Sequence, residues 1–111
     1  MSWGVDIEID HGDGYTTIVE VVDGHTYNLT PMWRKAGLAD ETGTRALDGK
    51  SCVDIGPRAA EALVDAWRNE AEYRELDPPN GWGDYDGFVE ILTRLTRLCL
   101  QHPRGVLRWN G

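Results

Sequence analysis

The chain has 111 residues, of which 41% are hydrophobic and 27% charged, with two cysteines and a formal net charge of −8 at pH 7. This length and composition are typical of one globular domain whose core folds without disulfides or metals. The negative charge argues against nucleic-acid binding, which needs clustered Lys and Arg, and no apolar run approaches the roughly 18 residues of a membrane span.

The first thirty residues carry the pattern of an antiparallel β-meander. Between residues 3 and 10, apolar side chains alternate with glycine or acidic residues, and this period of two is typical of a half-buried strand. Asp13-Gly14 and Asp23-Gly24 predict two hairpin turns, because Asp-Gly pairs supply positive φ angles. The segment between them, 15–22, is rich in Thr, Val and Ile, and its apolar residues on both faces favour a central strand. Residues 25–29 form the third predicted strand.

A capping signal at Thr30-Pro31 predicts a short helix over residues 31–36. Threonine accepts a backbone N–H at a helix start, and proline suits the first helical position. Gly37 is expected to end this helix. The following segment, 37–56, is rich in glycine and scattered charge, and we expect it to be a long loop, the least ordered part of the chain.

Two long helices are predicted next. The first, 57–75, begins at Pro57 and ends before the prolines at 78 and 79. The second runs over 84–101, and a last short strand, 106–109, is expected to pair with an edge of the meander and to bring Arg108 near the N-terminal acids. The apolar stripes expected to be buried are Ala60, Leu63, Val64, Trp67 and Ala71 on the first helix, and Phe88, Ile91, Leu92, Leu95, Leu98 and Cys99 on the second.

Together these elements predict a single α+β domain over residues 1–111. Its antiparallel β-sheet has three to four strands. Two long α-helices pack on one face of the sheet, and one short helix lies between the meander and the loop.

The stretch NGWGDYDG, residues 80–87, is the most unusual segment of the chain. It does not fit a dinucleotide fingerprint, since no strand precedes it, and it lacks the acidic pattern of a calcium loop. A structural turn explains its residue types better than a ligand site does. Asn80, Gly81 and Gly83 form the turn, Trp82 packs back over the helix pair, and Asp84 caps the second long helix.

Residues that typically carry catalysis or hold a metal are few. Cys99 and His102 are a single pair, whereas a zinc site usually shows two. The two serines, Ser2 and Ser51, do not lie on a strained nucleophile turn. We therefore expect no catalytic residue, no cofactor, no bound metal and no disulfide. Two cysteines also favour a reducing compartment.

Charge is unevenly distributed along the chain. Residues 1–23 hold six acids and no Lys or Arg, whereas residues 94–111 hold four arginines and no acid. The two ends either lie side by side and compensate each other, or the acids form a face that recognises a basic partner or imitates nucleic acid. Because Asp6, Glu8 and Asp10 alternate with core residues, we expect them to share one outward face. With Trp33 as an aromatic anchor on an exposed short helix, they form the predicted protein interface.

Three segments, TPMW (30–33), YRELDPPNGWGDYDG (73–87) and LCLQHP (98–103), carry a family resemblance. The chain resembles a group of small uncharacterised proteins encoded by tailed phages of actinobacteria and by their prophages. The resemblance spans most of the chain and implies a setting in the cytoplasm of an infected bacterial cell. It implies no catalytic residues. The first ten residues also lack the basic and apolar regions of a secretory signal, so we expect none.

The sequence therefore favours a non-enzymatic phage accessory protein that acts by protein–protein interaction with a host or phage protein. One alternative is a small-ligand protein of nucleotide type, in which the Trp82–Tyr85 turn stacks a base and Arg58 or Arg74 contacts the phosphate. The other is a minor virion component. Neither nucleic acid nor membrane is an expected partner.

Overall fold

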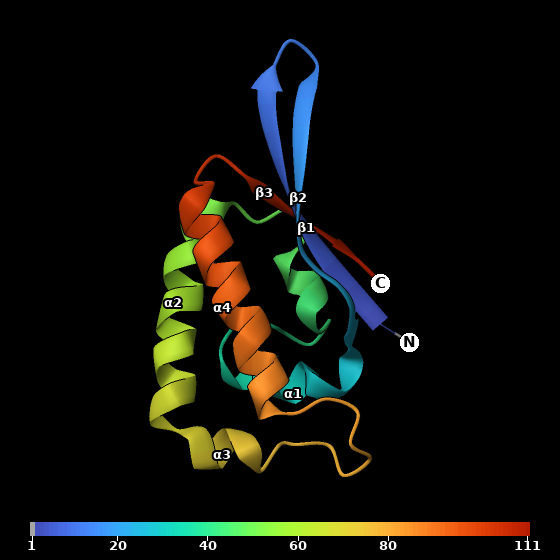
Figure 1. Ribbon diagram of the computed structural model, residues 1–111, viewed down its shortest axis with the longest axis vertical. Helices are drawn as coiled ribbons and strands as arrows, with labels where there is room; N and C mark the ends of the chain where they lie inside the picture. Colours follow the sequence, from blue (N-terminus) through green and yellow to red (C-terminus); the bar gives the residue numbers. More distant parts are fainter. Residues whose placement is uncertain (1) are drawn as a thin grey trace.

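The computed structural model describes residues 2–111 and has the predicted α+β fold. A three-stranded antiparallel sheet, in the order β2-β1-β3, is formed by β1 (Ser2–Gly12), β2 (Tyr15–Thr26) and β3 (Val106–Asn110). The two long helices lie side by side below the projecting β1–β2 hairpin (Figure 1). The helical elements are η1 (Tyr27–Leu29) and η2 (Thr44–Leu47), both 3₁₀, and α1 (Thr30–Lys35), α2 (Cys52–Arg68), α3 (Glu70–Arg74) and α4 (Tyr85–Gln101).

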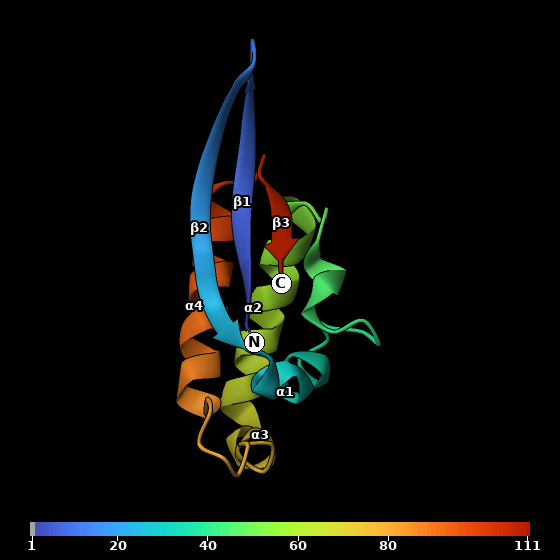
Figure 2. The same ribbon diagram turned by 90° about the vertical axis from the view of Figure 1, so that its right-hand side faces the viewer.

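Strand β1 is the centre of the sheet and carries its buried face. Trp3, Val5, Ile7 and Ile9 are buried, and the sheet turns this face towards α2 and α4 (Figure 2). The predicted pairing of the last strand with the N-terminal sheet is confirmed, because β3 pairs with β1. The outer edge of β3 is covered by the loop before α2, where the N–H groups of Gly49 and Leu107 bond to the carbonyls of Leu107 and Lys50, each at 2.8 Å.

The prediction that residues 15–22 form a central strand is wrong, since β2 is an edge strand. A β-bulge, and not a central position in the sheet, explains why apolar residues of β2 lie on both faces. Val5 pairs with Val22 and Asp6 with Glu20, so Val21 is an extra residue that forms a β-bulge. The bulge turns both Val21 and Val22 inward, where they are 0% and 7% exposed. Ile18 remains on the outer face and is 56% exposed.

The predicted third strand of the meander is also wrong. Asp23-Gly24 is a second irregularity within β2 instead of a hairpin turn, because Trp3 pairs with His25 while Val5 pairs with Val22. Gly24 has a φ of 71°, which an Asp-Gly pair permits in a bulge as well as in a turn. The strand continues to Thr26, and the chain then forms η1, so residues 1–30 contain a hairpin and no meander within the part of the chain that the structure describes.

The first helix begins one residue earlier than predicted. Thr30 is the first residue of α1 and Leu29 stands at its N-cap, without a side-chain cap bond, so the predicted capping role of Thr30 is wrong. Gly37 follows the helix with a φ of 79°, as expected for a residue that ends one. Trp33 and Met32 are buried in this helix, which packs against the core.

The predicted loop over 37–56 is shorter and more ordered than expected. It contains η2, whose Thr44 and Leu47 are each 2% exposed. Helix α2 already begins at Cys52, because Ser51 Oγ accepts the N–H of Asp54 at 3.3 Å and caps the helix. Pro57 therefore lies inside the helix, at a position that the missing N–H makes unfavourable but does not forbid.

The predicted helix over 57–75 is divided into α2 and α3 at Asn69, whose φ and ψ are −117° and 36°. The buried stripe of α2 also differs from the predicted one. Val64 and Trp67 are 40% and 57% exposed, because small residues face α4 and let the helices approach closely. A Cβ on Gly56, for example, would lie 3.2 Å from a methyl carbon of Leu100. The residues of α2 that are buried are Cys52, Ile55, Gly56, Ala59, Ala62, Leu63 and Ala66.

Helix α4 matches its prediction closely, and Asp84 is its N-cap residue. Gly87 donates its N–H to Asp84 Oδ1 at 2.7 Å. Of the predicted apolar face, Phe88, Leu92, Leu95, Leu98 and Cys99 are buried and Ile91 is partly buried. No helix within residues 2–111 combines the length and the apolar character that crossing a bilayer requires.

Both cysteines are buried where α2 and α4 meet. Cys52 begins α2, Cys99 lies in the last turns of α4, and each is a free thiol that is 1% exposed. Burial raises the pKa of both thiols above the usual value. Because the thiolate is the reactive form, both groups are expected to be unreactive in the folded protein.

The cap predicts the outcome of two substitutions at one position. Asp84→Ala removes the acceptor for the Gly87 N–H and should lower the free energy of unfolding by about 1 kcal/mol, whereas Asp84→Asn keeps an acceptor and should cost less. Urea unfolding followed by circular dichroism measures both values. Equal stability of the alanine variant and the native protein would show that the cap bond contributes nothing.

The buried thiols predict a difference between folded and unfolded protein. At pH 8 the native protein should react negligibly with Ellman's reagent, because the raised pKa keeps both thiols protonated and burial excludes the reagent. After denaturation in urea, two equivalents should react at once. Fast reaction of the native protein, or fewer than two thiols after denaturation, contradicts the arrangement.

Candidate functional site

The outer face of the sheet, which we call the open face, carries the acids predicted to form an interface. Asp6, Glu8 and Asp10 alternate along β1 with buried residues and therefore point to the side away from the core. Their partners on β2 are Glu20, Ile18 and Thr16, in that order. The open face is thus four carboxylates around the exposed side chain of Ile18.

The charges on the open face are not balanced. Asp6 lies directly across from Glu20, and like charges in this position destabilise a sheet. The predicted approach of Arg108 to the N-terminal acids is confirmed, because its Nε lies 3.4 Å from Glu8 Oε2. Both partners are well exposed, at 50% and 36%, so this ion pair adds little stability. One arginine among four carboxylates leaves the face negative.

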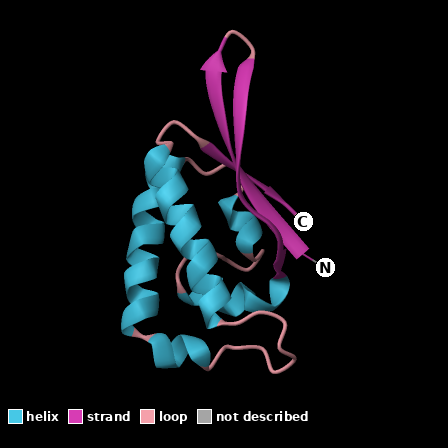
Figure 3. Ribbon diagram, viewed as in Figure 1, coloured by secondary structure: helices cyan, strands magenta, loops and turns pink. Residues whose placement is uncertain are grey.

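The far end of the β1–β2 hairpin, residues 10–18, projects from the rest of the molecule as continuous strand and turn (Figures 1 and 3). Every side chain in it is exposed, including Tyr15 at 75%. Local bonds hold its shape, since the Gly12 N–H donates to Asp10 Oδ1 at 2.8 Å and His11 Nε2 lies 2.7 Å from Thr17 Oγ1. This hairpin end therefore presents a defined surface without contributing buried area.

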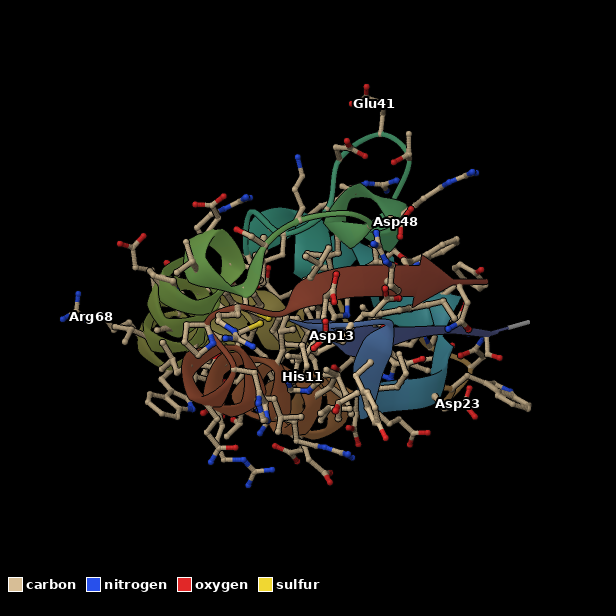
Figure 4. The ribbon with its side chains drawn as sticks, turned by 90° about the horizontal axis from the view of Figure 1, so that it is seen from above. His11, Asp13, Asp23, Glu41, Asp48 and Arg68 are labelled. Atoms are coloured by element: carbon tan, nitrogen blue, oxygen red, sulfur yellow. The ribbon has the colours of Figure 1, made fainter. Side chains whose placement is uncertain are left out.

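Two further acids lie on the side of the molecule that carries the sheet. In the view down onto the hairpin, His11 and Asp13 mark its end, and Asp23 projects on the opposite side from Arg68 of α2 (Figure 4). The sheet side thus carries Asp13 and Asp23 in addition to the open face. A basic partner approaching this side meets carboxylates first.

The prediction of Trp33 as an exposed anchor is wrong. Its side chain is 0% exposed and packs perpendicular to Trp3 and Phe88, with ring centroids 5.5 and 5.1 Å away. A short helix that contains a tryptophan can lie on the surface or in the core, and the sequence alone does not decide whether the tryptophan is exposed. The exposed large aromatics are Tyr15, Trp67 and Trp82.

The turn before α4 is built as predicted except at its tryptophan. Asn80 Oδ1 accepts the N–H of Trp82 at 2.9 Å, and Gly81 and Gly83 have φ values of 74° and 95°. A Cβ on Gly83 would lie 2.8 Å from the methyl carbon of Thr26, so the turn packs tightly against the end of β2. Trp82 does not pack over the helix pair, as predicted, but is 69% exposed.

Trp82 lines a pocket between this turn and the start of η1. The pocket has a volume of about 480 Å³. It combines three segments that are far apart in the sequence, and no single one of them signals it. The side chains that line it belong to Ser2, Thr26, Tyr27, Asn28, Asn80 and Trp82.

The geometry does not support a nucleotide held by Tyr85 and the two arginines suggested by the sequence. Tyr85 is 3% exposed, and its hydroxyl donates to the Ala66 carbonyl at 2.7 Å. Arg58 donates to the Gly37 carbonyl at 2.8 Å. Arg74 lies 2.7 Å from Glu70 and 3.1 Å from Asp86. These three side chains therefore contact other parts of the protein and do not converge on one position where a phosphate could bind.

Within residues 2–111, no three His, Cys, Asp or Glu side chains gather as a metal site would need. The chain was compared with models of protein families, with curated proteins and with solved structures, and none of them matches it.

Proposed function

We propose that this chain is a non-enzymatic binding protein that recognises a basic protein through the open face and the hairpin end. The observation that carries the proposal is the projecting hairpin, whose residues 10–18 are all exposed. An ordered arm with no buried contacts contributes little to stability. Its shape is instead suited to inserting into, or lying along, another molecule.

The side chains of this region match the division of roles found at protein interfaces. Tyr15 and Ile18 supply apolar contact area, and tyrosine is enriched among residues that dominate binding energy. The four carboxylates of the open face steer a basic partner and mainly raise the association rate. A partner cation between Asp6 and Glu20 also removes the repulsion that this pair carries in the free protein.

Two further observations support a protein as the partner and an infected bacterial cell as the setting. The net charge of −8 and the acidic open face disfavour phosphate backbones, which supports a protein partner over nucleic acid. The resemblance to small proteins of actinobacterial phages supports a role as a phage accessory protein in the cytoplasm of the infected cell. The partner is then a host or phage protein with a basic surface.

The experiment begins with capture of the partner from bacterial lysate by the tagged protein, followed by binding kinetics with three variants. Replacing Asp6, Glu8, Asp10 and Glu20 by their amides should lower the association rate about tenfold or more at low salt, because steering is lost. Tyr15→Ser with Ile18→Thr should mainly raise the dissociation rate. The matched control replaces four exposed glutamates away from the open face, at positions 41, 61, 75 and 90, by glutamine.

The control has the same net charge as the first variant and should bind as the native protein does. If the association rate of the control falls as much as that of the open-face variant, the net charge of the protein and not this surface governs binding. Native kinetics in both interface variants would place the interface elsewhere. A gel shift with bare DNA below micromolar concentration, weakening steeply with salt, would overturn the choice of a protein partner.

A further inference from the structure

We propose that the pocket beside Trp82 binds the base of a neutral nucleoside. This site is separate from the open face, because it lies at the Ser2 and Thr26 end of the hairpin, whereas the hairpin end comprises residues 10–18. The proposal for this pocket can therefore be tested independently of the proposed protein interface. Its volume of about 480 Å³ is within the range of small-molecule sites, roughly 300–1,000 Å³.

The aromatic wall of the pocket is held in place although it is exposed. Trp82 is 69% exposed. The backbone on both sides of it is nevertheless held, because Asn80 Oδ1 accepts the backbone N–H of Trp82 and Gly83 fits closely against Thr26. An indole that is exposed on a fixed turn offers its face for stacking, and stacking of a base on an aromatic ring is a main source of affinity at single bases.

The polar wall offers the groups that read the edge of a base. The side chain of Asn28 forms no hydrogen bond with the residues that the structure describes, so its amide has a donor next to an acceptor. A carboxamide of this kind pairs with base edges, which also carry donors next to acceptors. The Oδ1 of Asn80 already accepts from Trp82, so this side chain offers its NH₂ group as a donor.

The charge of the lining selects a nucleoside over a nucleotide. The six lining side chains are hydroxyls, amides and an indole, and none of them carries a charge that would neutralise phosphate. His25, which precedes Thr26, does not add one, because burial lowers its pKa and keeps the imidazole neutral at pH 7. The net charge of −8 further disfavours a phosphate in the pocket.

The test is a titration of ¹⁵N-labelled protein followed by NMR. The indole N–H signal of Trp82 is assigned by its loss in Trp82→Phe. Adenosine, guanosine, cytidine and uridine are added one at a time up to a few millimolar. At least one should shift this signal and the backbone signals of residues 26–28 in a saturable way, and its 5′-monophosphate should bind more weakly. Methyl β-glucoside, a neutral polyol without a base, should shift neither.

Two variants and a matched control link the binding to the pocket. Trp82→Ala should weaken binding at least about tenfold, and Asn28→Asp, which replaces the donor by a negative acceptor, should weaken it as well. Trp67→Ala removes a tryptophan of similar exposure on α2 and should leave binding unchanged. The amide spectrum of each variant confirms that it is folded.

Four results overturn the proposal. They are the absence of a saturable shift with all four nucleosides, a shift that Trp82→Ala leaves unchanged, binding of the glucoside in place of the nucleosides, and tighter binding of the monophosphate than of the nucleoside. Loss of nucleoside binding in Trp82→Ala with unchanged capture of the protein partner would show that the two sites are separate.

Discussion

Perpendicular packing of three aromatic rings is the contact on which the rest of the structure depends. Trp33 of α1 lies between Trp3 of β1 and Phe88 of α4, with centroids 5.5 and 5.1 Å away, and so joins the sheet to the helices. Phe88 in turn stacks on Tyr73 of α3 at 5.8 Å. Edge-to-face pairs of this kind add roughly 0.5–1.5 kcal/mol each beyond the area they bury. One cluster thus connects four elements that are distant in the sequence.

The cluster also contains buried polar ring nitrogens. Trp3 Nε1, Trp33 Nε1 and His25 Nε2 are buried without a hydrogen-bond partner among the described residues. The rings of these three residues pack perpendicular to one another, and edge-to-face packing of aromatic rings is favourable beyond the area it buries. The contacts of His25 with Trp3 and Trp33 also fix the end of β2. The end of β2 in turn positions Thr26 and Asn28, which line the pocket beside Trp82.

The molecule is thereby divided into a body that holds the fold and a hairpin that projects from it. The body contains the aromatic cluster and the close contact of α2 with α4. In the hairpin, Ile9 is the last buried residue of β1, and beyond it both strands are exposed. The open face adds carboxylates that repel one another across the strands. Repulsion of this kind weakens the sheet slightly.

Much of the fold follows from local patterns in the sequence, and the failures have identifiable causes. The alternation in residues 3–10 and the cap at Asp84 depend on neighbouring residues alone, and both describe the structure correctly. Asp23-Gly24 permits either a turn or a bulge, and only pairing with β1 decides between them. Helix α2 begins at Cys52, after the cap at Ser51, and not at Pro57, because a proline can also be accommodated within a helix.

The surfaces were less predictable than the fold, because exposure is a property of tertiary packing. Trp33 is buried and Trp82 is exposed, the reverse of the expectation. The outward row of acids on β1 follows from period-two alternation. The pocket combines Ser2, Thr26 to Asn28, and Asn80 to Trp82, and no local pattern reveals segments that meet only after folding.

We expect the hairpin end to be dispensable for folding, as the proposed binding role requires. Urea unfolding of a protein in which residues 10–16 are replaced by Asn-Gly tests it most directly, since Ile9 and Thr17 pair and a two-residue turn can join them. We expect a free energy of unfolding within about 1 kcal/mol of the native value, because the removed side chains are exposed. A loss of more than about 3 kcal/mol, or failure to fold, would contradict it and assign the hairpin end a structural role.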